Sequence, residues 1–307
     1  MKKAMYRRRV VYAGCTVDVS ETYPTQFGDS LTRERASNIG RGSPEAMKRY
    51  NAELAARRLA QILNENFVPD DIWATFTYEK DNRPESYKAA CEVMSGFTRK
   101  LRRLYDKYSV ELKYVKATAY GERGALHHHL VIPQGVPKRA ITSLWREHIG
   151  ASEKGHPPYY VELYPDGDYS GLAAYIVDQV NTDYLDDRYI KKWICSRNIK
   201  KPVEAVEDIE EIKWSEPPEA WDGYTIDTYS IKAGTNEITG RPYLFYRMVK
   251  IRDELTVRDD NGKLLRGAEA AQYIRRKNIQ YIRDNWCFIN DEGEVVFLNE
   301  LNERQDE

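Results

Sequence analysis

The spacing of hydrophobic residues predicts a regular series of helices and strands up to about residue 185. Between Pro44 and Phe67 apolar residues recur at helical spacing, and the aromatic and β-branched run IWATFTY at 72–78 is typical of a strand. The same criteria predict helices over 84–108, 138–148 and 168–181, and strands over 112–120, 125–132 and 159–164. From residue 72 the order is β-α-β-β-α-β-α, the split βαβ arrangement of ferredoxin-like folds. We therefore expect an α+β protein whose antiparallel sheet is covered by helices on one face.

The remaining segments show a weaker pattern. Residues 1–42 are polar and Arg-rich, so we expect an arm or loop with at most one short helix near 31–38, followed by the helix that starts at Pro44. Residues 202–222 are acidic and contain proline, which predicts a linker or long loop. Beyond it we expect strands within 223–257 around a turn at 239–240, a helix over 273–286 and a hairpin near Gly293. These patterns divide the chain into an N-terminal basic arm and helix (1–68), a core domain (69–185) and a C-terminal α+β extension (186–307).

Composition excludes several classes of protein. The 307 residues have a mean hydropathy of -0.71, and no apolar run approaches the roughly 18 residues that a membrane span needs. The basic start MKKAMYRRR is followed only by the short VVYAGCTV, so we expect no secretory signal. The four cysteines are scattered without a CxxC pair, which argues against a zinc ribbon or a disulfide framework and favours the reducing cytoplasm.

Charge allows local but not global attraction to nucleic acid. The 47 basic and 48 acidic residues nearly cancel, which counts against a globally basic nucleic-acid binder. Basic residues still cluster at 2–3, 7–9, 99–103, 191–192 and 275–277, and acidic residues concentrate within 204–219 and in the tail. The 23 tyrosines suit base stacking, although core packing and solvated surfaces account for most tyrosines and charges of this kind.

Three consecutive histidines stand in the predicted strand ALHHHLVI. Because side chains alternate along a strand, His127 and His129 share one face, and His128 lies on the other face beside apolar residues. We expect the apolar face to pack against the helices and the opposite face to present two imidazoles on an open sheet surface. Two imidazoles two residues apart can be two ligands of one metal ion. The alternative is a pair of polar histidines on a solvated sheet.

The helix after the last predicted strand carries the second candidate element, GLAAYIVDQVN. Tyr175 lies mid-helix, with Gln179 four residues later on the same face. The helix starts beside the sheet, so its tyrosine can face the two imidazoles. A helical tyrosine is more often a core residue, but its combination with the paired histidines favours a nucleophile.

The segments IWATFTY, GERGALHHHLVI and GLAAYIVDQ, in this order and spacing, resemble the three motifs of HUH endonucleases. The resemblance covers about residues 70–183. It is nearest to the rolling-circle replication-associated proteins of bacterial plasmids, phages and mobile elements, whose C-terminal extension is similar to GYTIDTYSI and TGRPYLFYRMV here. The resemblance implies an HUH endonuclease fold in the cytoplasm of a bacterial host cell.

The resemblance also implies a reaction. His127 and His129 would bind Mg²⁺ or Mn²⁺, which polarises the scissile phosphate of single-stranded DNA. Tyr175 would attack the phosphorus, forming a 5′-phosphotyrosine and releasing a 3′-hydroxyl for a polymerase. Many relatives have a third acidic or amide ligand, for which Glu122 is our candidate and Glu162 the alternative. Many also have a lysine where this chain has Gln179, and no second tyrosine lies four residues from Tyr175, so we expect a one-tyrosine enzyme.

The expected partner is single-stranded or melted origin DNA. The sequence contains no GxxxxGK[ST] motif, so a host helicase would unwind and a host DNA polymerase would extend. Candidate DNA contacts are Gln179, Arg99, Arg103, Arg7, Arg8, Arg9, Thr75 and Thr77.

Several alternatives stay open at this stage. They are a conjugative relaxase, a single-tyrosine transposase, a phosphoesterase that hydrolyses without a covalent adduct, and a non-catalytic module that binds single strands on its sheet. Thr75 and Thr77 could equally serve only strand packing, and the basic residues could be solvated. The sequence leaves the oligomeric state undecided.

Overall fold

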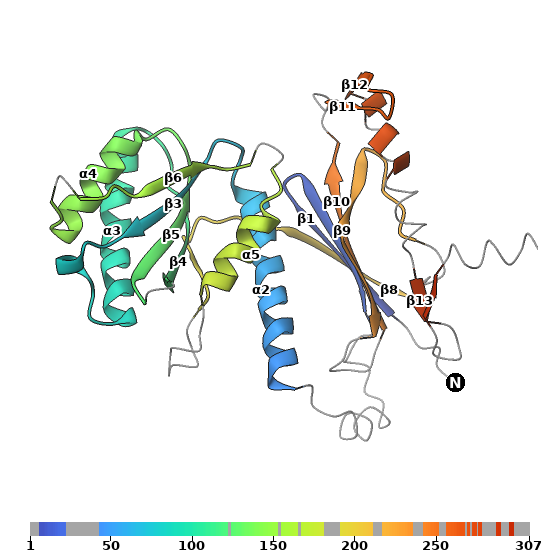
Figure 1. Cartoon of the computed structure of the whole chain (residues 1–307), viewed down its shortest axis with the longest axis horizontal. Helices are drawn as coiled ribbons and strands as arrows, with labels where there is room; N and C mark the ends of the chain where they lie inside the picture. The colour runs from blue at the N-terminus through green and yellow to red at the C-terminus, as the bar shows by residue number, and fades with distance from the viewer. Residues whose placement is uncertain are drawn as a thin grey trace, which may run out of the picture. The chain divides into compact units, whose positions relative to one another are not determined.

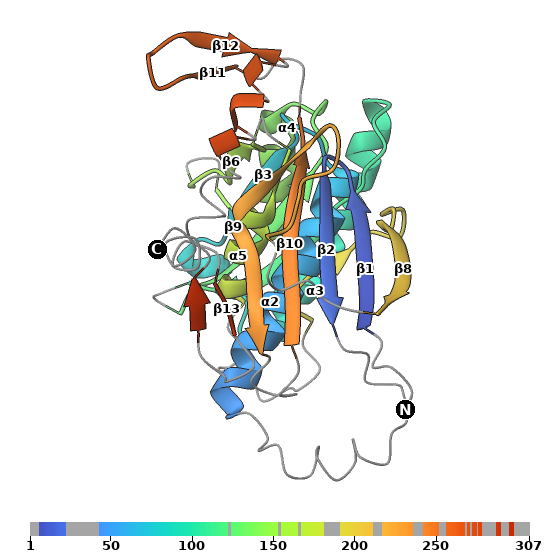
Figure 2. The same ribbon diagram turned by 90° about the vertical axis from the view of Figure 1, so that its right-hand side faces the viewer.

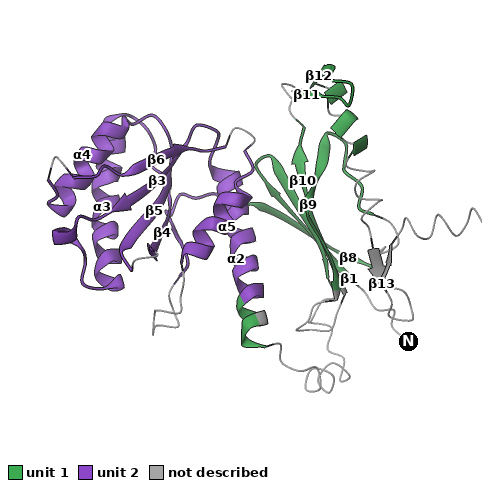
Figure 3. Ribbon diagram, in the orientation of Figure 1, with its two compact units in different colours: residues 1–48, 202–307 green, residues 49–201 purple. Residues whose placement is uncertain are grey.

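The computed structural model describes residues 6–22, 43–121, 124–152, 155–164, 167–180, 191–210, 217–235, 242–251, 256–267, 269–270, 272–274, 276–277, 287–289 and 295–297. These residues form two compact units, residues 49–201 and residues 1–48 together with 202–307 (Figure 3). The division differs from the three consecutive parts expected from the sequence, because strands from both ends of the chain share one sheet. No helix in the described part is both long and apolar enough to span a membrane.

The unit of residues 49–201 is built on an antiparallel sheet. Its strands are β3 (Ile72–Thr77), β4 (Val115–Tyr120), β5 (Leu126–Ile132), β6 (Tyr159–Glu162) and β7 (Ile194–Cys195). They lie in the order β6-β3-β5-β4-β7, so β5 is central. The expected strands at 72–78, 112–120, 125–132 and 159–164 are confirmed, and the α+β class is confirmed with them.

Helices cover both faces of this sheet (Figure 1). The helices α2 (Pro44–Asn66) and α5 (Ser170–Gln179) pack on one face, where the core includes Leu63, Ala117, Val131 and Ile176. On the other face pack α3 (Tyr87–Lys107) and α4 (Lys138–Ile149), and a short 3-10 helix, η1 (Lys80–Asn82), precedes α3. The expectation of helices on one face only is therefore wrong. Its physical reason is that β4 and β5 carry apolar residues on both sides, and both sides require burial.

The second unit contains another antiparallel sheet, formed by β1 (Tyr6–Ala13), β2 (Thr16–Thr22), β8 (Val203–Ile209), β9 (Tyr224–Thr235) and β10 (Pro242–Lys250). Figure 2 shows them side by side in the order β8-β1-β2-β10-β9. Two short antiparallel pairs follow: β11 (Thr256–Arg258) with β12 (Leu264–Arg266), and β13 (Cys287–Ile289) with β14 (Val295–Phe297).

These elements confirm the strands expected within 223–257 and around Gly293, although the turn at 239–240 and Gly293 itself lie outside the described residues. Of the helix expected over 273–286, residues 273–274 and 276–277 are helical, and 278–286 lie outside the described residues.

Two expectations for this unit are wrong. The basic N-terminal segment forms a hairpin of strands rather than an arm, and the acidic segment that begins near residue 202 forms the edge strand β8 rather than a linker. Ion pairs between these two strands explain why such polar sequences form a sheet. They join Arg7 to Asp208 at 3.0 Å, Arg8 to Glu207 at 2.8 Å and Arg9 to Glu204 at 2.6 Å. The short helix expected near 31–38 lies outside the described residues.

Candidate active site

The centre of the candidate site is the pair of imidazoles on β5. The Nε2 atoms of His127 and His129 lie 3.1 Å apart, and the two ring planes meet at 85°. Two nitrogen ligands that bind one divalent cation at a right angle, each about 2.1 Å from it, lie about 3 Å apart. The two nitrogens therefore fit adjacent positions in the coordination sphere of a divalent cation.

The other nitrogen of each ring faces the protein. The Nδ1 atom of His129 lies 3.2 Å from the hydroxyl of Thr75, its register partner on β3. The Nδ1 atom of His127 lies 3.5 Å from the carbonyl oxygen of Ala125. Partners of this kind fix the ring orientation and tautomer of histidines that bind metals. Both rings are thus held so that their Nε2 atoms converge.

Burial keeps these imidazoles neutral. His129 is only 2% exposed, and burial lowers its pKa to about 3, with a smaller contribution from His127. Burial also lowers the pKa of His127, while the Ala125 carbonyl opposes that shift. The expected open sheet surface is not observed for His129, because helices cover this face as well. A neutral imidazole has a free lone pair, which is the form that binds a metal.

Tyr175 lies beside the pair. Its ring centroid is 5.6 Å from that of His129 and 5.4 Å from that of Trp73, and the side chain is 43% exposed. The apolar residues Leu172 and Ile176 of α5 are buried in the core, so the opposite side of the helix presents Tyr175 to solvent. The arrangement combines an accessible hydroxyl with two convergent nitrogen ligands.

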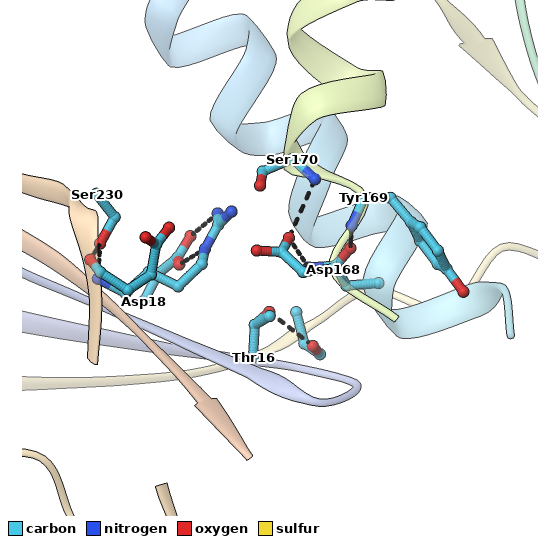
Figure 4. A network of polar contacts seen from close by, with 10 residues as sticks. Thr16, Asp18, Asp168, Tyr169, Ser170 and Ser230 are labelled. Carbon is cyan, nitrogen blue, oxygen red and sulfur yellow. Dashed lines mark hydrogen bonds and ion pairs between the residues drawn. The ribbon is translucent and has the colours of Figure 1, made fainter. Parts of the chain in front are cut away.

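The start of α5 is fixed by hydrogen bonds with α2. A carboxylate oxygen of Asp168 accepts from the backbone N–H of Ser170 and from the amide of Asn64. The Asn64 carbonyl oxygen in turn accepts from the backbone N–H of Tyr169 (Figure 4). The bonds satisfy N–H groups that a helix start leaves without partners, and they set where the helix begins relative to the sheet.

A third ligand is not assembled by the described residues. Glu122 lies outside them. Glu162 lies opposite Ile72 on the neighbouring strand, whereas the histidines face Thr75 and Thr77, and its carboxylate accepts a bond from Lys138 at 3.0 Å. Across the described ranges no three His, Cys, Asp or Glu side chains are grouped to hold a metal.

The other predicted DNA contacts fall in different places. Thr77 is exposed and is the register partner of His127, and Gln179 lies half-buried at the end of α5. By contrast, Arg99 and Arg103 are exposed on α3, which packs on the face of the sheet opposite to the imidazoles. The arginines of β1 belong to the other unit, where carboxylates of β8 bind them.

Sequence reasoning missed the polar network around the middle histidine. His128 is fully buried, its Nε2 lies 2.6 Å from the Tyr78 hydroxyl, and its Nδ1 lies 2.9 Å from the Thr118 hydroxyl. Burial lowers the pKa of His128 to about 3. A histidine on the apolar side of a strand is a sequence feature that indicates such buried partners.

Comparison with known proteins adds one match. No curated protein and no solved structure matches the chain. A family model does match, and the segment it covers contains His127, His129 and Tyr175. The resemblance to rolling-circle replication initiators is therefore confirmed for residues 71–178, which match the model of the replication-associated protein ORF2 family, a family of rolling-circle replication initiators.

Proposed function

We propose that this protein starts rolling-circle replication by nicking single-stranded or melted origin DNA in a metal-dependent reaction. The observation that carries the proposal is the convergence of the His127 and His129 Nε2 atoms, 3.1 Å apart, beside the exposed ring of Tyr175. The family match supports a role in replication initiation. The strand order β6-β3-β5-β4 also agrees with the split βαβ arrangement expected of an HUH endonuclease.

In this proposal each residue has a distinct role. His127 and His129 hold Mg²⁺ or Mn²⁺, which when bound supplies charge stabilisation at the scissile phosphate. The Tyr175 hydroxyl loses its proton and its oxygen forms a bond to phosphorus, while the bond from phosphorus to the 3′ oxygen breaks and that oxygen takes up a proton. One phosphodiester replaces another, so the 5′-phosphotyrosine keeps the energy needed for later religation.

Recruited proteins complete the proposed cycle. The sequence has no P-loop of its own, so a host helicase separates the strands and a host polymerase extends the 3′-hydroxyl. Gln179 carries no charge, so a cation that neutralises the phosphate comes from elsewhere in the protein or from the metal itself.

The test is covalent capture of DNA. Full-length protein is incubated with Mn²⁺ and a randomised single-stranded DNA pool, and peptide mass spectrometry locates any nucleotide adduct. We expect an adduct on Tyr175 that is lost with EDTA, with Tyr175→Phe, and with His127→Ala plus His129→Ala. Tyr164→Phe is the matched control, because Tyr164 is 45% exposed, close to the 43% of Tyr175.

Each alternative function predicts a different result. DNA binding without an adduct, also with circular DNA from the source replicon, would favour a non-catalytic module. Cleavage with free ends and no adduct would favour hydrolysis. Sequencing of the trapped strand then separates an origin of replication from a transfer origin or a transposon end.

A further inference from the structure

We infer that Thr75 is a positioning residue that sets the tautomer of His129 and thereby aims its Nε2 lone pair at the metal. The inference rests on the proposed metal site and concerns this chain's own hydroxyl, which the sequence had suggested only as a weak DNA contact. The Thr75 hydroxyl lies 3.2 Å from Nδ1 of His129, and the two residues are register partners on adjacent strands.

The two histidines have unequal partners. The Ala125 carbonyl can only accept a hydrogen bond, so it favours a proton on Nδ1 of His127 and leaves the Nε2 of that ring with a lone pair. The Thr75 hydroxyl can either donate or accept. His129 can therefore carry its proton on either nitrogen without losing its bond to Thr75.

This difference matches two states of the site. Without a cation, Nε2–H of His129 can donate to Nε2 of His127 across the 3.1 Å separation, while Thr75 donates to Nδ1. With a cation between the two Nε2 atoms, the proton of His129 must lie on Nδ1, and Thr75 accepts from it. Rotation of one hydroxyl and a tautomer shift of one ring connect the states, and no proton is gained or lost. Thr75 thus keeps His129 bonded in both.

Thr77 provides a matched control on the same strand. It lies on the same face as Thr75 and is the register partner of His127. It is exposed, and within the described part of the chain its hydroxyl makes no hydrogen bond. A change from threonine to valine at 77 therefore reports the effect of that substitution on β3 without the bond to a histidine.

The experiment measures Mn²⁺ binding to full-length protein without DNA, by calorimetry or by the loss of the free-ion EPR signal. We expect Thr75→Val to weaken Mn²⁺ affinity about 10-fold or more, as is typical when the partner of a metal-binding histidine is removed. Thr75→Ser keeps a hydroxyl and should stay close to wild type, as should Thr77→Val. NMR of the imidazole nitrogens with diamagnetic Zn²⁺ should show Nδ1 of His129 protonated in the bound wild-type protein.

Equal Mn²⁺ affinity of Thr75→Val and the wild type would overturn the inference. If Thr75→Val fails to fold, Thr75→Ala is compared with Thr75→Ser, and equal affinities of these two would overturn it as well. A wild-type protein that binds no Mn²⁺, or binds it equally after His129→Ala, would instead refute the proposed metal site. The outcomes therefore separate failure of the positioning role from failure of the proposed function.

Discussion

Replacement of His128 by leucine tests whether its buried network stabilises the central strand. The imidazole is fully buried and bonded on both nitrogens, to Tyr78 at 2.6 Å and to Thr118 at 2.9 Å. Leucine fills a similar volume but offers neither bond. His128→Leu therefore leaves two hydroxyl groups without their histidine partner inside a core from which water is excluded.

The magnitude follows from the two groups. A buried polar group that loses its partner costs about 1–3 kcal/mol. Tyr78 is 8% exposed and bears most of this cost, whereas the Thr118 hydroxyl keeps a contact with the Cys91 sulfur at 3.6 Å. We expect His128→Leu to lower the free energy of unfolding by about 2–4 kcal/mol.

The assay is a double-mutant cycle measured by urea denaturation at pH 7.5. Tyr78→Phe alone also breaks the network, but combined with His128→Leu it replaces both partners with apolar groups. The double variant should be more stable than the sum of the single changes predicts, by about 1–2 kcal/mol. Tyr105→Phe is the control, because Tyr105 is also buried but donates to the Pro133 carbonyl, so it should combine additively. Additivity of the Tyr78 cycle, or a loss below about 0.5 kcal/mol for His128→Leu, would refute the reasoning.

Three further predictions concern pH and charge. The pKa of His128 is lowered, so the stability is fully present above about pH 6.5 and falls as the pH drops toward 3; denaturation at several pH values should show a slope about 1.4 kcal/mol per unit smaller in His128→Leu, and equal slopes would contradict this. Asp18→Ala strands the buried guanidinium of Arg247, which Asp18 binds at 2.6 and 3.0 Å (Figure 4), and should cost about 3–5 kcal/mol in the same assay; a loss below about 1 kcal/mol would contradict it. Arg9→Ala removes an exposed pair with Glu204 and should cost less than about 1 kcal/mol, decreasing with added salt; a larger, salt-independent loss would refute it.

Strong local patterns account for what the sequence predicted well. The strands around IWATFTY and ALHHHLVI combine apolar, aromatic and β-branched residues, and the helices between them bury apolar residues at regular spacing. Alternation along β5 also separates His128 from His127 and His129, as the structure shows. These features depend on neighbours within one element, so the sequence contains them directly.

Long-range pairing accounts for what the sequence did not reveal. The arginines of β1 and the acidic residues of β8 lie almost 200 positions apart, and each run by itself is typical of a solvated segment. Their opposite charges favour a sheet only when the strands are adjacent. The alternation of Val17 and Val19 with Asp18 after the turn at Gly14 was a local indication of this hairpin, hidden by the surrounding charge.

The error about the covered face changes the chemistry expected of the histidines. On an open sheet surface His129 would keep an ordinary pKa near 6.5 and would exchange its lone pair for a proton in mild acid. In the structure burial lowers that pKa to about 3, and the ring of Trp73 lies 5.8 Å away. The core residues of α2 and α5 that contradict the open surface therefore also keep the lone pair free, which is the condition for a nitrogen ligand. Burial of this face thus favours the proposed metal site more than the expected exposure would have done.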